Sequence, residues 1–174
     1  MKRTLIFLIL LAVVVIAIVF YFPKDVTINA QGIKYRLGND ALEQPIHVTI
    51  KGKVHRSLLG DRTFKGIVEL EGEELPVPQN QRQLELKFYK EFGAVIIYAY
   101  NDRGAAKHHS VGTIYFDKHF NNATIALLEP KENTGSSWSA ADGLMITVPA
   151  TNRQEAANKS NEIMGKYING YILE

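Results

Sequence analysis

The sequence predicts an α+β protein, with an N-terminal transmembrane helix, a mainly antiparallel β-sheet or β-sandwich domain and one C-terminal amphipathic helix. Three observations predict this fold class. Residues 4–22 form an uncharged apolar run. Several later segments alternate apolar and polar residues with a period of two, which is typical of half-buried antiparallel strands. Residues 152–171 place apolar side chains on one stripe at helical spacing.

The apolar run at the N-terminus is long enough for a membrane span. A helix over residues 4–22 would reach roughly 28 Å, close to the thickness of the hydrocarbon core of a bilayer. Lys2 and Arg3 precede the run, and the positive-inside rule then places the N-terminus in the cytoplasm. We therefore predict a signal anchor over residues 1–22 in a single-pass cell-membrane protein whose C-terminal domain lies outside.

A cleaved secretory signal is the alternative interpretation of the same run. Signal peptides usually have shorter apolar regions that end in a small-x-small cleavage site. This run instead ends in Phe20, Tyr21, Phe22 and Pro23, although residues 28–30 offer a site farther along. An uncleaved anchor is favoured, and cleavage in the native host stays open. The absence of cysteine excludes a lipoprotein, disulfides and cysteine-ligated metals.

The first part of the outer region reads as strands joined by turns. Residues 23–44 form either a stalk or the first short strands, at 26–29 and 33–37. Residues 45–55 and 62–71 alternate clearly and predict a hairpin. Gly52 falls on its inner row, which indicates a bulge or a large facing side chain.

Residues 45–174 are interpreted as one extracytoplasmic β-rich domain. The prolines at 76 and 78 predict a loop over 72–81, and further loops are expected at 104–110 and 129–137. The terminal helix begins with a capping box, formed by Thr151 with Gln154 or by Asn152 with Glu155. The remaining strands are predicted at 84–89, 94–100, 111–116, 120–128 and 144–148.

Charge limits the classes of partner. The chain has 20 Lys and Arg against 18 Asp and Glu, and the excess lies in Lys2 and Arg3, so the outer domain is formally neutral. Nucleic-acid-binding domains normally carry a basic excess, so a nucleic-acid partner is not expected. The expected partners are the membrane, through residues 4–22, and an envelope protein or cell-wall component.

Three of the five histidines suggest a metal site. His108 and His109 are adjacent, His119 follows ten residues later, and zinc accepts three such ligands. Neighbouring residues on a strand point to opposite faces, so His108 and His109 can share a metal only from a loop, where the sequence places them. A metal-binding accessory protein is therefore one alternative function. Solvated loop histidines, with no cofactor, are the favoured interpretation.

Asp117, His119 and Trp138 are the other candidate site residues. Asp117 and His119 would share one face of a strand and could serve acid–base chemistry, which makes an envelope hydrolase the second alternative. No serine lies in a G-x-S-x-G or S-x-x-K pattern. Trp138, the single tryptophan, lies among small residues and could stack on a ligand or fill the edge of a core.

Two segments carry a family resemblance. Residues 112–116 and 143–150, followed by Asn152 and Arg153 at a helix start, resemble small membrane-anchored or lipoprotein-type envelope proteins of Bacillus-like Gram-positive bacteria. The resemblance covers about the last third of the chain. It implies an envelope location and no particular activity. We therefore expect a non-enzymatic, membrane-anchored domain that binds a partner or envelope component.

Overall fold

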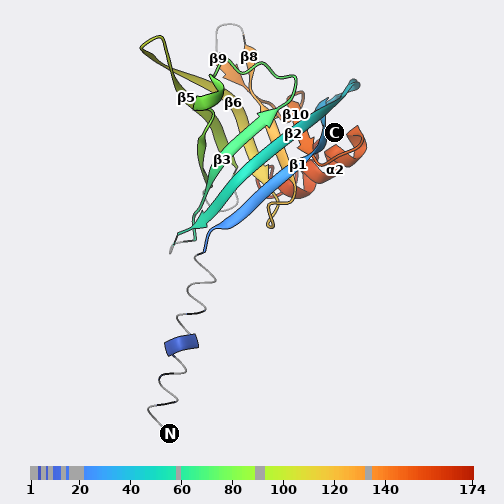
Figure 1. The fold of residues 1–174 in the computed structure, drawn as a ribbon. Helices are drawn as coiled ribbons and strands as arrows, with labels where there is room; N and C mark the ends of the chain where they lie inside the picture. Colours follow the sequence, from blue (N-terminus) through green and yellow to red (C-terminus); the bar gives the residue numbers. More distant parts are fainter. Residues whose placement is uncertain are drawn as a thin grey trace.

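The computed structural model describes residues 4, 7, 10–12, 15, 22–57, 60–88, 93–131 and 135–174. Eight strands form one antiparallel sheet in the order β4-β3-β2-β1-β10-β7-β6-β5 (Figure 1). The short strands β8 and β9 pair separately. The elements are β1 (Lys24–Arg36), β2 (Asn39–Arg56), β3 (Arg62–Leu70), the 3-10 helix η1 (Gln79–Gln81), β4 (Leu84–Phe88), β5 (Ala94–Asp102), β6 (Ala105–Phe116), β7 (Ala123–Leu127), β8 (Glu129–Lys131), β9 (Gly135–Ser137), β10 (Leu144–Val148) and α2 (Arg153–Met164).

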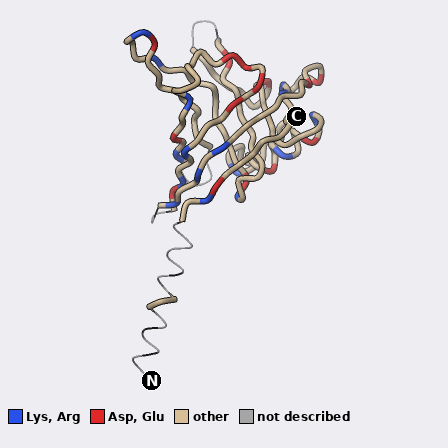
Figure 2. The backbone as a smooth tube through the Cα atoms, viewed as in Figure 1, with Lys and Arg blue, Asp and Glu red and all other residues tan. Residues whose placement is uncertain are grey.

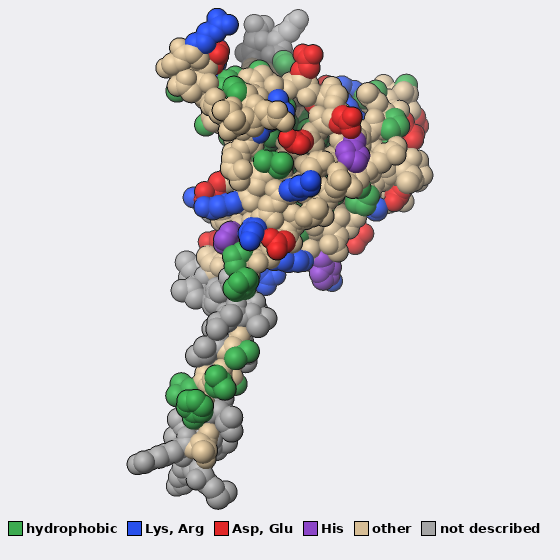
Figure 3. Space-filling view, viewed as in Figure 1, with side chains coloured by type: hydrophobic (Ala, Val, Ile, Leu, Met, Phe, Trp, Pro, Cys, Tyr) green, Lys and Arg blue, Asp and Glu red, His purple; other side chains and the backbone are tan. Residues whose placement is uncertain are grey.

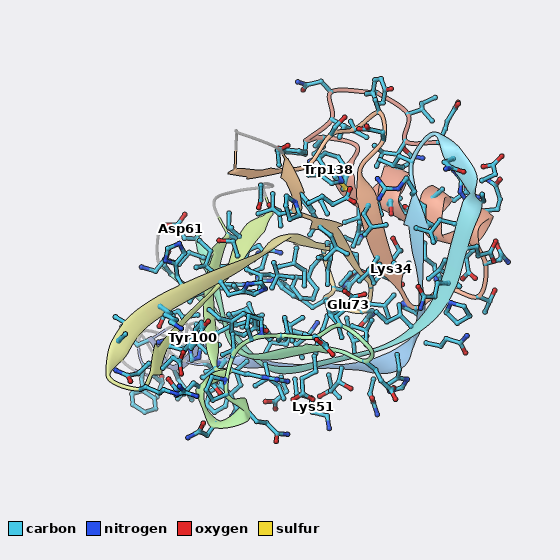
Figure 4. The ribbon with its side chains drawn as sticks, turned by 90° about the horizontal axis from the view of Figure 1, so that it is seen from above. Lys34, Lys51, Asp61, Glu73, Tyr100 and Trp138 are labelled. Atoms are coloured by element: carbon cyan, nitrogen blue, oxygen red, sulfur yellow. The ribbon has the colours of Figure 1, made fainter. Side chains whose placement is uncertain are left out.

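The sheet curls on itself into a nearly closed barrel. Strand β1 pairs with β2 on one side and with β10 on the other, which joins the two ends of the domain sequence. Strands β4 and β5 end the sheet and contact each other. Among the residues that the structure describes, no ladder connects these two strands. Figure 4 looks into the barrel from above, with side chains filling its interior.

The predicted fold class is wrong in its architecture. The protein is mostly β, and one curled sheet replaces the expected α+β sheet or sandwich. Along each strand, every second side chain is buried in a sandwich and in a barrel alike. The period of two therefore predicts strands and cannot distinguish between these two ways of covering them.

The predicted membrane anchor is also contradicted. No helix within the described part of the chain is long and apolar enough to cross a membrane. This finding overturns the predicted signal anchor over residues 4–22 and the single-pass cell-membrane location with the domain outside. Much of that segment lies outside the described residues. The prediction rested on hydropathy, which measures apolar character and does not establish a continuous helix.

Strand β1 is continuous over the region where the sequence predicts a stalk or two short strands. Its first half buries Val26 and Ile28 in the barrel, while its second half buries Ile33 and Tyr35 on the opposite face, beneath α2. The alternation therefore changes phase along a single strand. Near the upper end, Lys34 pairs with Glu73 from the loop after β3, where the two side chains lie together in Figure 4.

The barrel interior is filled by its own side chains. Phe64 is fully buried, and its ring lies over two glycines that face each other on β2 and β3. A Cβ on Gly52 would lie 2.8 Å from the Phe64 ring, and one on Gly66 would lie 2.7 Å from it. The large facing side chain expected opposite Gly52 is thus confirmed.

Helix α2 packs on the outside of the barrel, against β1, β10, β7 and β6 (Figure 1). The N-cap is Asn152, whose side chain accepts from Glu155 N at 2.9 Å. The helix ends at Met164, before the predicted 171, and Asn169 and Gly170 then adopt positive φ. Its buried residues are Ala156, Ala157, Ser160 and Met164.

Two predicted loops contain strands. Residues 105–110 belong to β6 and pair with β5 in an exposed hairpin arm, and residues 129–137 include the β8–β9 pair. The 105–110 segment has exposed side chains on both faces over most of its length. It therefore lacks the alternation that marks a half-buried strand.

Candidate functional site

A groove of about 470 Å³ lies at the end of the barrel where β3 begins and β4 ends, over rings of the interior cluster. The turn between β6 and β7 forms one wall, and the last part of α2 forms the other. Its lining is Arg62, Phe88, Tyr115, Phe116, Asp117, Lys118, His119, Phe120, Glu162, Ile163 and Lys166.

The turn at residues 117–122 is held by the Asp117 carboxylate. Oδ1 accepts from Asn121 N at 2.8 Å, and Oδ2 accepts from Asn122 Nδ2 at 2.8 Å. Asp117 N donates to Asn122 O at 3.1 Å, which closes the hairpin. These bonds fix the backbone that presents Lys118, His119 and Phe120 to the groove.

Phe120 occupies an unusual backbone conformation within this turn. Its φ is +62°, in the left-handed region that a bulky residue seldom adopts. Such a conformation costs on the order of 1–3 kcal/mol, and residues of this kind cluster at ligand sites. Phe120 is nevertheless buried, with its ring turned into the groove floor.

Aromatic rings form that floor. The Phe120 centroid lies 5.0 Å from that of Phe116 and 6.2 Å from that of Phe88. On the helix side, the Tyr115 and Tyr167 centroids are 5.2 Å apart. Edge and tilted contacts of this kind add to the stability gained from burial. The floor is therefore an apolar surface held in place by its own packing.

Basic groups surround the aromatic floor. The Arg62 guanidinium lies over the Phe120 ring, with Cζ 5.8 Å from the centroid. Lys118 and His119 are exposed on the turn, and Lys24 Nζ donates to the His119 carbonyl oxygen at 2.7 Å. Figure 3 shows Lys, Arg and His side chains on this lower end of the barrel, and Figure 2 marks Lys and Arg positions along the backbone there.

The predicted pair Asp117 and His119 lies at this groove, but in a turn instead of on a strand. Partial burial alone would raise the pKa of Asp117. Hydrogen bonds from the Asn122 side chain and from the backbone of Asn121, Asn122 and His119 outweigh it, and the pKa is lowered. An ionised carboxylate held by several donors is poorly suited to exchanging protons near neutral pH. The geometry therefore does not favour the hydrolase alternative.

The predicted pair His108 and His109 lies on β6, paired with Ala99 and Tyr98 of β5. Adjacent strand residues point to opposite faces, so the loop arrangement required for shared chelation is not present. Within the described ranges, no group of three or more His, Asp or Glu side chains is placed to hold a metal ion.

Trp138 does not line the groove. It is half-buried and packs against the cluster beneath α2. A Cβ on Gly143 would lie 2.3 Å from Trp138 Nε1, so this glycine permits the close approach. Nε1 is shielded and has no hydrogen-bond partner in the described structure. This packing favours the core-edge role over ligand stacking.

The sequence interpretation missed Arg62, Phe88, Phe120 and Ile163 as site residues. They come from four separate segments, and only the fold brings them together. The one local signal was the Asp117–Asn122 turn, in which a phenylalanine precedes two asparagines.

Comparison with known proteins adds no further assignment. No family model matches the chain, and neither a curated protein nor a solved structure gives a significant match.

Proposed function

We propose that this protein is a non-enzymatic binding domain and that the groove between the 117–122 turn and α2 receives the apolar part of a ligand. The observation that carries the proposal is the aromatic floor formed by Phe88, Phe116 and Phe120. An apolar concave surface bordered by a few polar groups is the usual character of a ligand site.

The filled interior of the barrel supports a site at its end, where the rings of the floor border the interior cluster. Eight-stranded barrels either pack their interior with side chains or hold one small ligand there. In this protein Ile50, Phe64 and Ile114 are fully buried in the interior cluster, together with Tyr98. At the upper end, Lys34 pairs with Glu73, and Val77 from the same loop joins the interior cluster.

The chemistry of the groove supports binding over catalysis. Asp117 accepts hydrogen bonds from its own turn, and Arg62 lies against a ring. A nucleophile-and-base pair within hydrogen-bonding distance is the usual signature of covalent catalysis. The Asp117 carboxylate is instead occupied by donors of its own turn, Asn121 N and Asn122 Nδ2.

The proposal is tested with N-phenyl-1-naphthylamine, an uncharged dye whose fluorescence rises in apolar surroundings. The dye should bind the wild-type protein and bind Ile163→Gln several-fold more weakly, because Ile163 lines the groove. Ile97→Gln is the matched control, since Ile97 is 49% exposed on β5, outside the groove. Absence of dye binding, or equal loss in both variants, would contradict the proposal. Thermal melts of both variants establish that they are folded.

A further inference from the structure

We infer that the ligand of this groove is an amphipathic anion, with an apolar body on the aromatic floor and a terminal acidic group at the basic rim. The inference rests on the proposed binding function and adds the chemical class of the ligand. It is drawn from the position of the charges around the rings.

Arg62 is the best-placed cation for an acidic group. Its guanidinium lies over Phe120, so the ring orients it at the edge of the floor. A guanidinium presents a planar fork of donors that matches a carboxylate or phosphate. An acidic group bound there would lie directly beside the apolar surface.

Further basic side chains come from the turn and the chain start. Lys118 and His119 line the groove, and the hydrogen bond from Lys24 Nζ to the His119 carbonyl brings another ammonium group to this rim. Lys24, Arg62 and the adjacent pair Lys118 and His119 come from three distant segments, so no single run of basic residues marks the site in the sequence. Their convergence gives the rim a positive character.

The acidic residues of the lining offset this charge only in part. Asp117 is ionised, but it accepts hydrogen bonds from Asn121 and Asn122 within its turn. Glu162, on α2, is the other carboxylate of the lining, and Lys166 follows just beyond the end of the helix. The last turn of α2 also presents partial negative charge, which a nearby Lys166 opposes.

The positions of the rings and of the charged groups determine where the apolar and the acidic parts of the ligand would lie. The aromatic rings lie at its floor and the ammonium and guanidinium groups at its rim. A compact inorganic anion would leave the rings uncovered, and a neutral hydrocarbon would form no ion pair with Arg62 or Lys118. A chain or ring system ending in one carboxylate, sulfonate or phosphate meets both requirements.

The test displaces bound N-phenyl-1-naphthylamine with decanoate or with 1-decanol, which share one chain length and differ in charge. Decanoate should displace the dye at a concentration about tenfold lower than 1-decanol, as expected for a charge-assisted hydrogen bond. Lys118→Gln should reduce this difference several-fold. Lys51→Gln, an exposed lysine on β2 outside the groove, should leave it unchanged.

The outcomes separate the two proposals. Equal displacement by decanoate and 1-decanol would overturn the anionic ligand while leaving the apolar groove supported. The anionic ligand would also be overturned if Lys51→Gln reduced the difference between decanoate and 1-decanol as much as Lys118→Gln does. The acidic group would then not be bound at the rim. Failure of the dye to bind the wild-type protein would instead contradict the binding function itself.

Discussion

The Tyr98 hydroxyl donates a hydrogen bond to the carbonyl oxygen of Val68 at 2.8 Å. The two residues lie on β5 and β3, which are not neighbours in the sheet. Strand β4 begins at Leu84, opposite Gly66, so its ladder does not extend to Val68. We call the contact between the two edges of the sheet the seam of the barrel. Tyr98 therefore bridges this seam, from β5 to β3, at the level where β4 no longer pairs with β3.

Removal of this hydroxyl should weaken the barrel closure. Tyr98→Phe leaves a buried carbonyl without its partner, which costs about 1–3 kcal/mol. Urea unfolding of the variant should show a lower free energy of unfolding by that amount. Tyr171→Phe is the control, since Tyr171 is 54% exposed and should change little. Equal stabilities for Tyr98→Phe and the wild-type protein would show that the bridge does not hold the seam.

The burial of Tyr98 predicts that the folded protein loses stability at alkaline pH. Burial raises the pKa of Tyr98 to about 12. In the unfolded chain tyrosine ionises near pH 10, so the folded state favours the neutral phenol. This contribution to stability is present below about pH 10 and is lost as the pH rises toward 12. The difference in melting temperature between wild type and Tyr98→Phe should narrow over that range, and a constant difference would contradict this account.

Ser160 joins α2 to the sheet through buried hydroxyl groups. Its Oγ lies 2.7 Å from Thr147 Oγ1, 2.8 Å from Tyr35 Oη and 3.1 Å from Thr124 Oγ1. Ser160→Ala should lower the free energy of unfolding by about 1–3 kcal/mol, because buried hydroxyls lose a shared partner. Asn158→Ala, exposed on the same helix, should have little effect. Similar unfolding curves for the two variants would show that the network does not hold the helix.

The start of α2 should be sensitive to acid. Hydrogen bonds from Lys159 and then from Thr151 lower the pKa of Glu155 to about 2. Its stabilising contribution is present above the unfolded value of about 4.5 and is lost as the pH falls toward 2. Glu155→Gln should therefore melt below the wild type at pH 7 and together with it near pH 2. A difference that persists unchanged at low pH would contradict this assignment.

The local sequence pattern was sufficient to predict most of the strands and the start of the helix. Residues such as Val48, Ile50 and Val54 alternate with polar neighbours and are buried as expected, although in a barrel and not in a sandwich. The Asn152–Glu155 cap was also among the sequence predictions. The two halves of the sheet are joined by the pairing of β1 with β10, over a hundred residues apart, which no local sequence pattern predicts.

The site was only partly predictable for the same reason. Asp117 and His119 were identified as chemically interesting, and both border the groove. Arg62 and Phe120 gained their significance from stacking on each other across the fold. The histidines at 108 and 109 were misplaced because their exposed hairpin arm shows no hydrophobic alternation.

The central claim is that the groove beside α2 is the ligand site. Amide chemical shifts of the ¹⁵N-labelled protein, followed during titration with decanoate, test it most directly. The largest changes should fall on Lys118, His119 and Ile163, with little change at Thr49 on the outer face of β2. Changes centred instead on the β1–β2 face or around Trp138, or no localised changes at saturating decanoate, would contradict the account.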